Sequence, residues 1–387
     1  MRSNLGFFSD EKFRSIFFQT LVIGLFALGI FFIVNTTAYN LEKRNIATGW
    51  SFLQNPAGFD ISFSPFLEFK STDTHLKVYF VGVLNTLLVS ITGCIAATIL
   101  GFLLGIIRLS SNWLLSRLVY IYVEFSRNVP LLLQIILWYS ILIQLPRVKQ
   151  SLQVLDVFYI SNRGLYSPRP IFESGFSYVL IAIVLALVSS FLINRWAKNR
   201  QDKTGQQFPV FSSSIGLIFV VPLILFFILG SPMSFEHPEL KGFNFKGGLV
   251  IRPEFIAMFL ALSIYTAAFI SEIVRAGIMS VSKGQREASA AIGLKQTWIM
   301  RLIIIPQALR VIVPPLTSQY LNLTKNSSLG IAVGYADLVH GFGGISLNQT
   351  GQAIECMVIV MATYLTISLT ISFFMNIYNR SIQFKEK

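Results

Sequence analysis

Four ionisable side chains lie within otherwise apolar stretches of the sequence, in two pairs of the same spacing. Glu124 and Arg127 are three residues apart, and so are Glu272 and Arg275. Side chains three apart share one face of a helix, and ionisable groups at membrane depth mark a transport pathway or an internal pair. The alternative is that each pair neutralises itself near a helix end, where the arginine can reach water. The residues alone leave both interpretations open.

A third group of polar side chains gathers in one apolar stretch, beside the dipeptide Pro314-Pro315. Unwound backbone there could bind the ammonium and carboxylate of a zwitterion. The alternative is that these groups form hydrogen bonds between helices, each worth only about 0.6 kcal/mol. The candidates for a substrate pathway are Glu124, Arg127, Glu272, Gln319, Asn322, Lys325, Asn326 and Ser327.

The sequence holds no residues arranged for catalysis or for a nucleotide. It has no Gly-x-x-x-x-Gly-Lys-Ser/Thr loop to hold phosphates. The three histidines, His75, His237 and His340, are too far apart for a metal-ligand spacing. Cys94 and Cys356 lie in apolar runs, which disfavours a disulfide. We therefore expect no catalytic site, metal or cofactor in this chain. If the chain transports a substrate uphill, the energy must come from an ion gradient or from another protein.

The elements that carry these residues are predicted to be membrane-spanning helices. Of the 387 residues, 53% are hydrophobic and 13% are charged, whereas soluble domains have about 25% charged residues. Runs of more than about 18 apolar residues indicate spanning helices. The sequence predicts an all-α polytopic membrane protein with about eight transmembrane helices, near residues 17–34, 79–107, 118–145, 178–193, 213–230, 255–274, 308–330 and 354–376.

The positions of lysine and arginine predict an orientation. If the N-terminus is inside, the inside loops hold more of the basic residues and the outside loops more of the acidic ones. This bias places both termini in the cytoplasm. The first apolar run is longer than a signal-peptide core of about 7–15 residues, which favours a retained helix. The net charge is +13. The basic residues flank apolar runs and form no stripe with interleaved aromatic residues, which disfavours nucleic acid as a partner.

Composition divides the chain into four regions. The predicted regions are an N-terminal helix with an outside segment at 1–78, a first part of the core at 79–145, an insertion with two extra helices at 146–254, and a second part of the core at 255–387. The last region contains a cytoplasmic loop at 276–306. The insertion differs from its surroundings because its outside loops are rich in Pro, Gly and Phe.

The cytoplasmic loop contains the stretch "GQREASAAIGLKQTWIMRLIIIP", from Gly284 to Pro306. Alanines favour a short helix that Gly293 would end, and a second helix would run to Pro306, which disfavours its continuation. A helix with small side chains has a low profile that fits a groove on a partner, and Glu287 can add charge complementarity. The alternative is an ordinary connecting loop.

The spacing in this loop resembles the EAA loop of ABC importer membrane subunits. Glu287-Ala288-Ser289, three residues, Gly293, nine residues and "IIIP" match the family pattern Glu-Ala-Ala, three residues, Gly, nine residues and Ile-x-Leu-Pro. Ser289 stands in place of an alanine and Ile305 in place of a leucine. The resemblance implies a coupling helix that docks into an ATPase subunit, with coupling residues Gly284, Glu287, Ala288, Ser289, Gly293 and Pro306.

Further stretches resemble polar-amino-acid permeases, and two of them resemble general L-amino-acid permeases. These are "YVEFSRNVPLLLQI", "YTAAFISEIVRAGI", "VPPLTSQY" and, for the narrower group, "LTKNSSLGIAVGYADLV" and "NQTGQAIE". Many polar-amino-acid permeases have Lys-Asp-Thr-Ser-Leu where this chain has "KNSSL". The loss of that acid weakens the case for a strongly cationic substrate.

The resemblance implies a type I ABC importer permease fold, a place in the bacterial inner membrane, and a set of partners. The expected partners are a dimer of ATPase subunits that bind ATP and Mg, a second homologous permease subunit in a heterodimer, a periplasmic amino-acid-binding protein, an amino-acid substrate of broad range, and the lipid bilayer. The pair Gly101 and Gly105 permits close helix packing, with a second membrane subunit as one candidate neighbour.

The competing interpretation is an ion-coupled secondary amino-acid transporter that acts alone. Such transporters commonly bind ions at paired discontinuous helices related by an inverted repeat. The sequence predicts one interrupted span, around Pro314, and no convincing mate for it. An energised importer with several subunits is therefore favoured.

Overall fold

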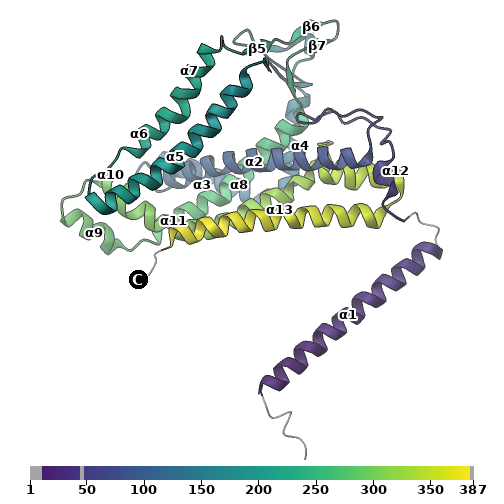
Figure 1. Cartoon of the computed structure of the whole chain (residues 1–387), viewed down its shortest axis with the longest axis horizontal. Coiled ribbons are helices and arrows are strands. Elements are labelled where there is room, and N and C mark those ends of the chain that lie inside the picture. Colours follow the sequence, from purple (N-terminus) through teal and green to yellow (C-terminus); the bar gives the residue numbers. More distant parts are fainter. Residues whose placement is uncertain (1–10, 44–47, 384–387) are drawn as a thin grey trace, which may run out of the picture. The chain divides into compact units, whose positions relative to one another are not determined.

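A computed structural model describes residues 11–43 and 48–383 of the chain. The chain divides into two compact units, one built from Met1–Leu137 with Met258–Lys387 and the other from Trp138–Ala257. Each unit is described by itself below (Figure 1). The division into core regions and an insertion at 146–254, as predicted from composition, stays a prediction.

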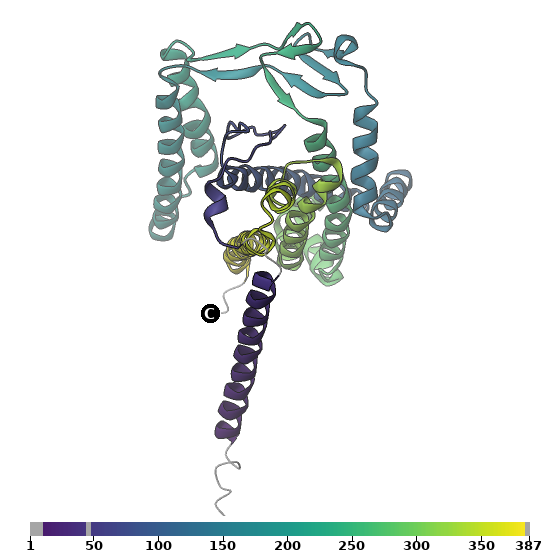
Figure 2. The same cartoon turned by 90° about the vertical axis from the view of Figure 1, so that its right-hand side faces the viewer.

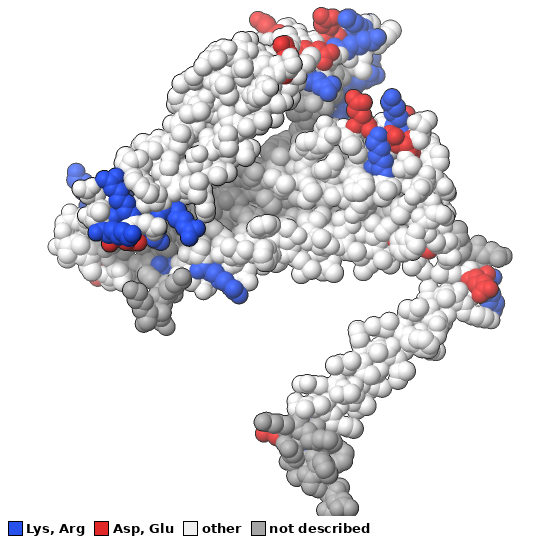
Figure 3. Space-filling view, viewed as in Figure 1, with Lys and Arg blue, Asp and Glu red and all other residues white. Residues whose placement is uncertain are grey.

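Most of the described residues are helical, which confirms the all-α polytopic class. Seven helical stretches among them are long and apolar enough to cross a membrane, and a bent helix pair raises the number to eight if it counts as one span. On the face drawn in Figure 3, charged side chains gather at helix ends and among the strands and leave the long flanks uncharged. The seven stretches are Arg14–Lys43, His75–Ile107, Phe176–Thr204, Val210–Ile228, Pro253–Met279, Gln296–Val333 and Ala353–Ile382.

The span expected at 118–145 is not one straight helix. It consists of α3 (Trp113–Asn128) and α4 (Leu131–Ile143), which meet at an angle of 106°. Pro130 lies between them and has no N–H to continue α3. Gln134 Nε2 donates to the carbonyls of Ser126 and Val129, at 2.9 and 3.1 Å, so acceptors at the bend are satisfied.

The helix expected to stop at Pro306 continues past it. From α10 (Gln296–Ile299) the chain passes through a π turn, η5 (Met300–Ile304), into α11 (Ile305–Asn326), with Pro306 in the first turn of α11. A first-turn position needs no N–H donor, and the wider π turn accommodates the ring. The expectation of a break there was wrong. Pro314 and Pro315 also lie inside α11, and the chain tightens to a 3-10 helix, η6 (Ser327–Val333), only after Asn326.

Glycines let three helices of the first unit pack at short range. A Cβ atom at Gly101 of α2 (His75–Ile107) would lie 2.5 Å from Ile270 of α8 (Pro253–Met279). A Cβ atom at Gly105 would lie 2.8 Å from Val274, and one at Gly277 would meet the side chain of Ile312 in α11. The Gly101 and Gly105 pair is therefore filled by α8 of the same chain, and not by a second subunit.

At the start of α2, the first unit is closed by residues 48–74 and by the turns before α13 (Ala353–Ile382). Glu355 Oε1 accepts a hydrogen bond from Gly49 N at 2.7 Å, and His75 Nδ1 lies 2.9 Å from Ser346 Oγ. Asn85 Nδ2 donates to the carbonyls of Phe63 and Ala336, both at 2.8 Å. These bonds fix η7 (Leu338–Ser346) and α12 (Leu347–Thr350) against the start of α2.

The second unit combines a pair of antiparallel helical stretches with small sheets. α5 (Phe176–Thr204) pairs with α6 (Val210–Ile215), η4 (Gly216–Val220) and α7 (Val221–Ile228), and the strands lie at one end of this pair (Figure 2). A four-stranded antiparallel sheet has the order β1-β2-β3-β8, beside the ribbons β4-β5 and β6-β7. The strands are β1 (Leu152–Val154), β2 (Phe158–Ser161), β3 (Gly164–Ser167), β4 (Arg169–Phe172), β5 (Met233–Glu236), β6 (Glu239–Lys241), β7 (Asn244–Lys246) and β8 (Leu249–Ile251).

Candidate functional site

The short helix α9 (Lys283–Ala291) stands clear of the rest of its unit on most sides. Gly284, Glu287, Ala288 and Gly293 are all exposed, and nothing lies within 4 Å of a Cβ atom built at Gly284 or Gly293. The open flanks leave room for another backbone to approach closely. α9 is thus a low helix with an accessible side on which this chain places no other side chain close to Gly284 or Gly293.

Ser289 is the one buried residue of α9. Its Oγ donates to the carbonyl of Gln285 one turn earlier, at 2.5 Å, so the hydroxyl group is satisfied within the helix. This side chain faces the chain itself and not the open side of the helix. The replacement of an alanine by serine in the motif therefore leaves the accessible face unchanged.

Gly293 ends α9, as the sequence predicts. Its φ of +82° lies in the left-handed region that favours glycine. Gly293 N donates to Ala290 O at 2.9 Å, and Leu294 N donates to Ser289 O at 3.2 Å, which is the Schellman pattern of helix termination. Two apolar side chains near this turn are exposed, Ile292 at 76% and Trp298 of α10 at 49%. Apolar groups of this size on a charged loop are typical of an interface.

Glu272 is held by two arginines at the α9 end of the unit. Arg275 Nη2 lies 2.5 Å from Glu272 Oε1, and Arg108 Nη1, from the end of α2, donates to Glu272 Oε2. Tyr120 of α3 has the guanidinium groups of Arg108 and Arg117 over its ring, each 5.2 Å from the centroid. The cluster ties α2, α3 and α8 together, so Glu272 is placed as a structural ion pair.

Glu124 and Arg127 do not form the pair that their spacing allows. Among the described ion pairs none joins them, and the guanidinium of Arg127 instead lies 5.5 Å from the ring centroid of Phe269 in α8. Arg127 is exposed and Glu124 is half-buried. Self-neutralisation therefore describes Glu272 with Arg275 but not Glu124 with Arg127.

The polar residues of α11 divide between two faces of that helix. Ser318, Asn322 and Lys325 are exposed and follow one another at spacings of four and three, so they form a polar stripe on one face. Gln319 and Asn326 are half-buried at its border. Ser327 faces inward, where its Oγ donates to Thr324 O at 2.8 Å. The structure thus brings Asn322 and Lys325 together on an accessible face and separates Ser327 from them.

A buried carboxyl group lies near this helix and was not among the residues singled out from the sequence. Asp337 is 0% exposed; its Oδ1 accepts from His340 N at 2.8 Å and its Oδ2 from the Tyr364 hydroxyl at 3.3 Å. Burial raises the pKa of the Asp337 carboxyl from 3.8 to about 7. The signal was present in the sequence, since Asp337 is the acid of "GYADLV", but its burial follows only from the fold.

The sequence of this chain is similar to those of a protein family and of several named proteins. Residues 203–384 match the family described as "binding-protein-dependent transport system inner membrane component". The general L-amino acid transport system permease protein AapQ of Rhizobium johnstonii is 49% identical over 379 residues, which is 98% of this chain and 94% of that protein.

Two further relatives are similar over nearly the same length. The putative amino-acid ABC transporter permease protein YhdX of Escherichia coli is 46% identical, over 98% of this chain and 97% of that protein. The glutamate/glutamine/aspartate/asparagine transport system permease protein BztB of Rhodobacter capsulatus is 43% identical, over 98% and 96%.

The spanning helices and these relatives define a multi-pass inner-membrane transport protein. The chain belongs to the family of binding-protein-dependent inner-membrane components, the permease subunits of ABC importers. Members of this family are transporter subunits and not enzymes: a separate ATPase hydrolyses the nucleotide, and a substrate-binding protein is the other partner. The permease domain has no cofactor of its own.

Proposed function

We propose that this chain is the membrane-spanning subunit of an ATP-driven importer of L-amino acids with a broad substrate range. The names of the relatives support the substrate class, since AapQ is a general L-amino-acid permease and BztB a permease for four acidic and amide amino acids. Asn326 supports the same conclusion, because a neutral amide there adds no attraction for a cationic side chain. The chain itself contributes the pathway and the coupling contacts.

The observation that carries this proposal is the exposure of α9. Gly284, Glu287, Ala288 and Gly293 leave a flat helix with free space on its open side, and Pro306 lies in the first turn of α11, the next long helix. Together with Ser289, which sits on the inner face of the helix, these residues make up the coupling site. In this proposal ATP and Mg bind to a dimer of ATPase subunits, whose movement is passed through α9 to α8 and α11. The spans then alternate between outward-open and inward-open arrangements as rigid bodies.

The substrate pathway lies along the polar stripe of α11. A lysine at membrane depth costs about 3 kcal/mol or more in contact with lipid, so Lys325 requires another protein surface or water beside it. A second, homologous permease subunit in a heterodimer provides both. Asn322 and Lys325 then face the substrate, with Gln319 and Asn326 at the edge of the pathway.

Both termini are assigned to the cytoplasm. Arg310 Nε donates to Ile382 O at 2.9 Å, so the end of α13 lies beside the start of α11, on the side of α9. That side also carries Arg108, Arg275 and Lys283, in agreement with the positive-inside bias. Residues 48–74 and the strands of the second unit are then periplasmic.

Co-purification tests the coupling site directly. The complex would be isolated with Glu287→Lys plus Gly293→Trp and compared with a matched control, Asp202→Lys plus Gly205→Trp. The control changes an exposed acid and a left-handed glycine, with φ of +70°, at the end of α5. We expect the ATPase and ATP-dependent amino-acid uptake to be lost from the first variant and kept in the control.

The contrary result would be uptake that follows an ion gradient and is unaffected by either variant, with no ATPase in the native preparation. That result would support a secondary transporter. Loss of the ATPase from both variants would show that a strained helix end alone disrupts the complex, and α9 would no longer be the docking helix.

A further inference from the structure

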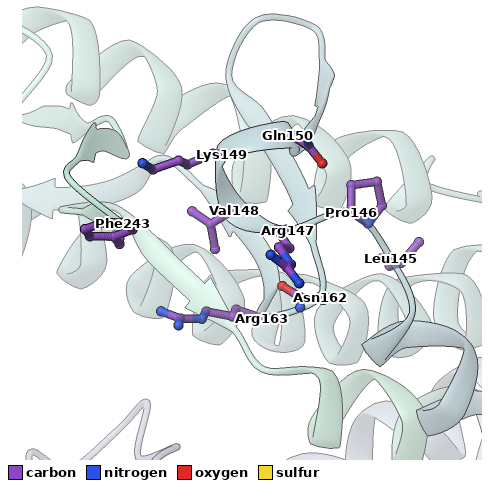
Figure 4. A pocket seen from close by; sticks show the side chains of 9 residues that line it. All are labelled: Leu145, Pro146, Arg147, Val148, Lys149, Gln150, Asn162, Arg163 and Phe243. Atoms are coloured by element: carbon purple, nitrogen blue, oxygen red, sulfur yellow. The ribbon is translucent and has the colours of Figure 1, made fainter.

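The second unit contains a pocket of about 650 Å³ among its loops. Its walls come from η3 (Val148–Gln150) with the residue before it, from the turn between β2 and β3, and from the turn between β6 and β7 (Figure 4). The polar and aromatic lining is Arg147, Lys149, Gln150, Asn162, Arg163 and Phe243. None of the residues assigned above to the coupling site or to the substrate pathway lines this pocket.

The lining is cationic and contains no acid. Arg147, Lys149 and Arg163 supply three positive charges, and no aspartate or glutamate lines the pocket. The ammonium of Lys149 lies 4.1 Å from the ring centroid of Phe243, which positions that charge beside an aromatic face. Figure 4 shows the Lys149 and Arg163 side chains extending toward the Phe243 side of the pocket. Such an arrangement favours carboxylate groups.

The walls of the pocket are fixed by packing and hydrogen bonds. Val148, which lines the pocket, forms a buried cluster with Tyr166 and Phe245. Asn162 N donates to Pro146 O at 2.9 Å, which joins the β2-β3 turn to the segment that carries Arg147. The Tyr166 hydroxyl donates to Asn244 Oδ1 at 3.0 Å, next to Phe243. The cations are thus held on a preformed frame, which lowers the entropy cost of binding.

We propose that this pocket receives acidic side chains of the amino-acid-binding protein when it docks on the periplasmic side. This inference rests on the proposed function, which makes that protein a partner and places the strands outside. Arg147, Lys149, Arg163 and Phe243 are all exposed, with Phe243 at 79%. Sites for small ligands enclose most of the ligand, whereas exposed arginine and aromatic side chains around a pocket are typical of protein interfaces.

The test measures the affinity of the purified complex, in nanodiscs, for the amino-acid-binding protein that supports its uptake. Arg147→Glu plus Arg163→Glu would be compared with Arg169→Glu plus Lys246→Glu, which make the same charge change on exposed strand residues outside the pocket. We expect the pocket variant to raise the dissociation constant at least about tenfold and to flatten its dependence on salt. The control variant should bind like the native complex.

Two further measurements keep the outcomes separate. Co-purification of the ATPase and ATP hydrolysis without binding protein should be native in both variants; if the native complex itself lacks them, the proposed function fails and not only this inference. Equal affinities for native complex and pocket variant, with normal ATPase retention, would overturn the docking site. A difference that appears only in nanodiscs with anionic lipid would also overturn it, since the pocket would then bind lipid headgroups. Arg147→Gln plus Arg163→Gln would replace the reversal if the latter fails to fold.

Discussion

Arg275 and Glu272, one helical turn apart in α8, form an ion pair with an N–O distance of 2.5 Å. The same carboxylate accepts a second hydrogen bond from Arg108 of α2, whose side chain is only 9% exposed. One acid therefore serves two cations at the point where α2 and α8 approach each other. Removing the acid leaves both cations partly buried and without their partner.

Glu272→Gln should accordingly destabilise the subunit by about 1–3 kcal/mol. The measurement is the melting temperature of the purified complex, with Asp73→Asn as the control. Asp73 pairs with one lysine, Lys77 at 2.8 Å, whose side chain is 32% exposed, whereas the Arg108 side chain beside Glu272 is only 9% exposed. A melting temperature for Glu272→Gln equal to that of the control would contradict the structural assignment of Glu272.

Gly277→Val should impair assembly of the subunit because the added side chain meets Ile312 of α11 at short range. Overpacking of this kind costs about 1–3 kcal/mol, and here it also separates the two helices that follow and precede the cytoplasmic loop. The yield of folded complex by size-exclusion chromatography is the readout. Gly216→Val is the matched control, since nothing lies within 4 Å of a Cβ atom at that helical glycine. Equal yields would show that the close approach of α8 and α11 is not required.

Lys325→Met should lower amino-acid uptake at least about tenfold, equivalent to 1.4 kcal/mol in the barrier, while the ATPase stays bound. The substitution keeps the length of the side chain and removes its charge from the α11 stripe. Uptake into proteoliposomes and ATPase retention would be measured together, with Lys198→Met as a control on an exposed lysine of α5. Normal uptake by Lys325→Met would remove Lys325 from the pathway.

Asp337 should make the stability of the subunit depend on pH. The pKa of this carboxyl is about 7 in the fold because of burial, against an ordinary value of 3.8. The fold therefore favours the protonated form: the contribution to stability is fully present below pH 4 or so and is lost as the pH rises through about 7. The melting temperature of the native protein should fall between pH 5 and 8.

Asp337→Asn should remove this part of the pH dependence, because its amide oxygen can still accept from His340 N and carries no charge. Tyr335 and Tyr364 are the titratable side chains that feel the charge of Asp337. Asp73→Asn is the control, since a hydrogen bond from Lys77 lowers the pKa of Asp73. Parallel pH profiles for the native protein and Asp337→Asn would refute the prediction.

The positions of the membrane helices could be predicted well from the sequence, because long apolar runs satisfy their own backbone in any surroundings. Where a proline lies within an apolar run, the sequence did not predict whether the helix bends or continues, because that depends on the local backbone geometry. Pro130 bends the chain by 106°, whereas Pro314 and Pro315 are accommodated within α11. A proline removes one donor in each case, and only the neighbouring turns decide whether the helix continues.

The strands of the second unit were not foreseen, although turn signals were present. The sequence around Asn162-Arg163-Gly164 allows a two-residue hairpin, and Gly164 has a φ of +124° with its Cβ position blocked by Ile251 O. Strands of three or four residues carry too little periodicity to recognise alone. The accessible side of α9 could be predicted from its motif, but the inward face of Ser289 could not.

The exposed stripe of α11 has a consequence for how cells supply this subunit. In the heterodimer proposed above, a copy without its membrane partner would present Lys325 and Asn322 to lipid, because the other face of α11 is packed against α13. In such a copy a polar helix face would be in contact with hydrocarbon, a feature that membrane proteases and chaperones can recognise. In the proposed heterodimer, unequal synthesis of the two permease subunits would therefore leave this polar face of α11 in lipid, at a cost of about 3 kcal/mol or more for Lys325.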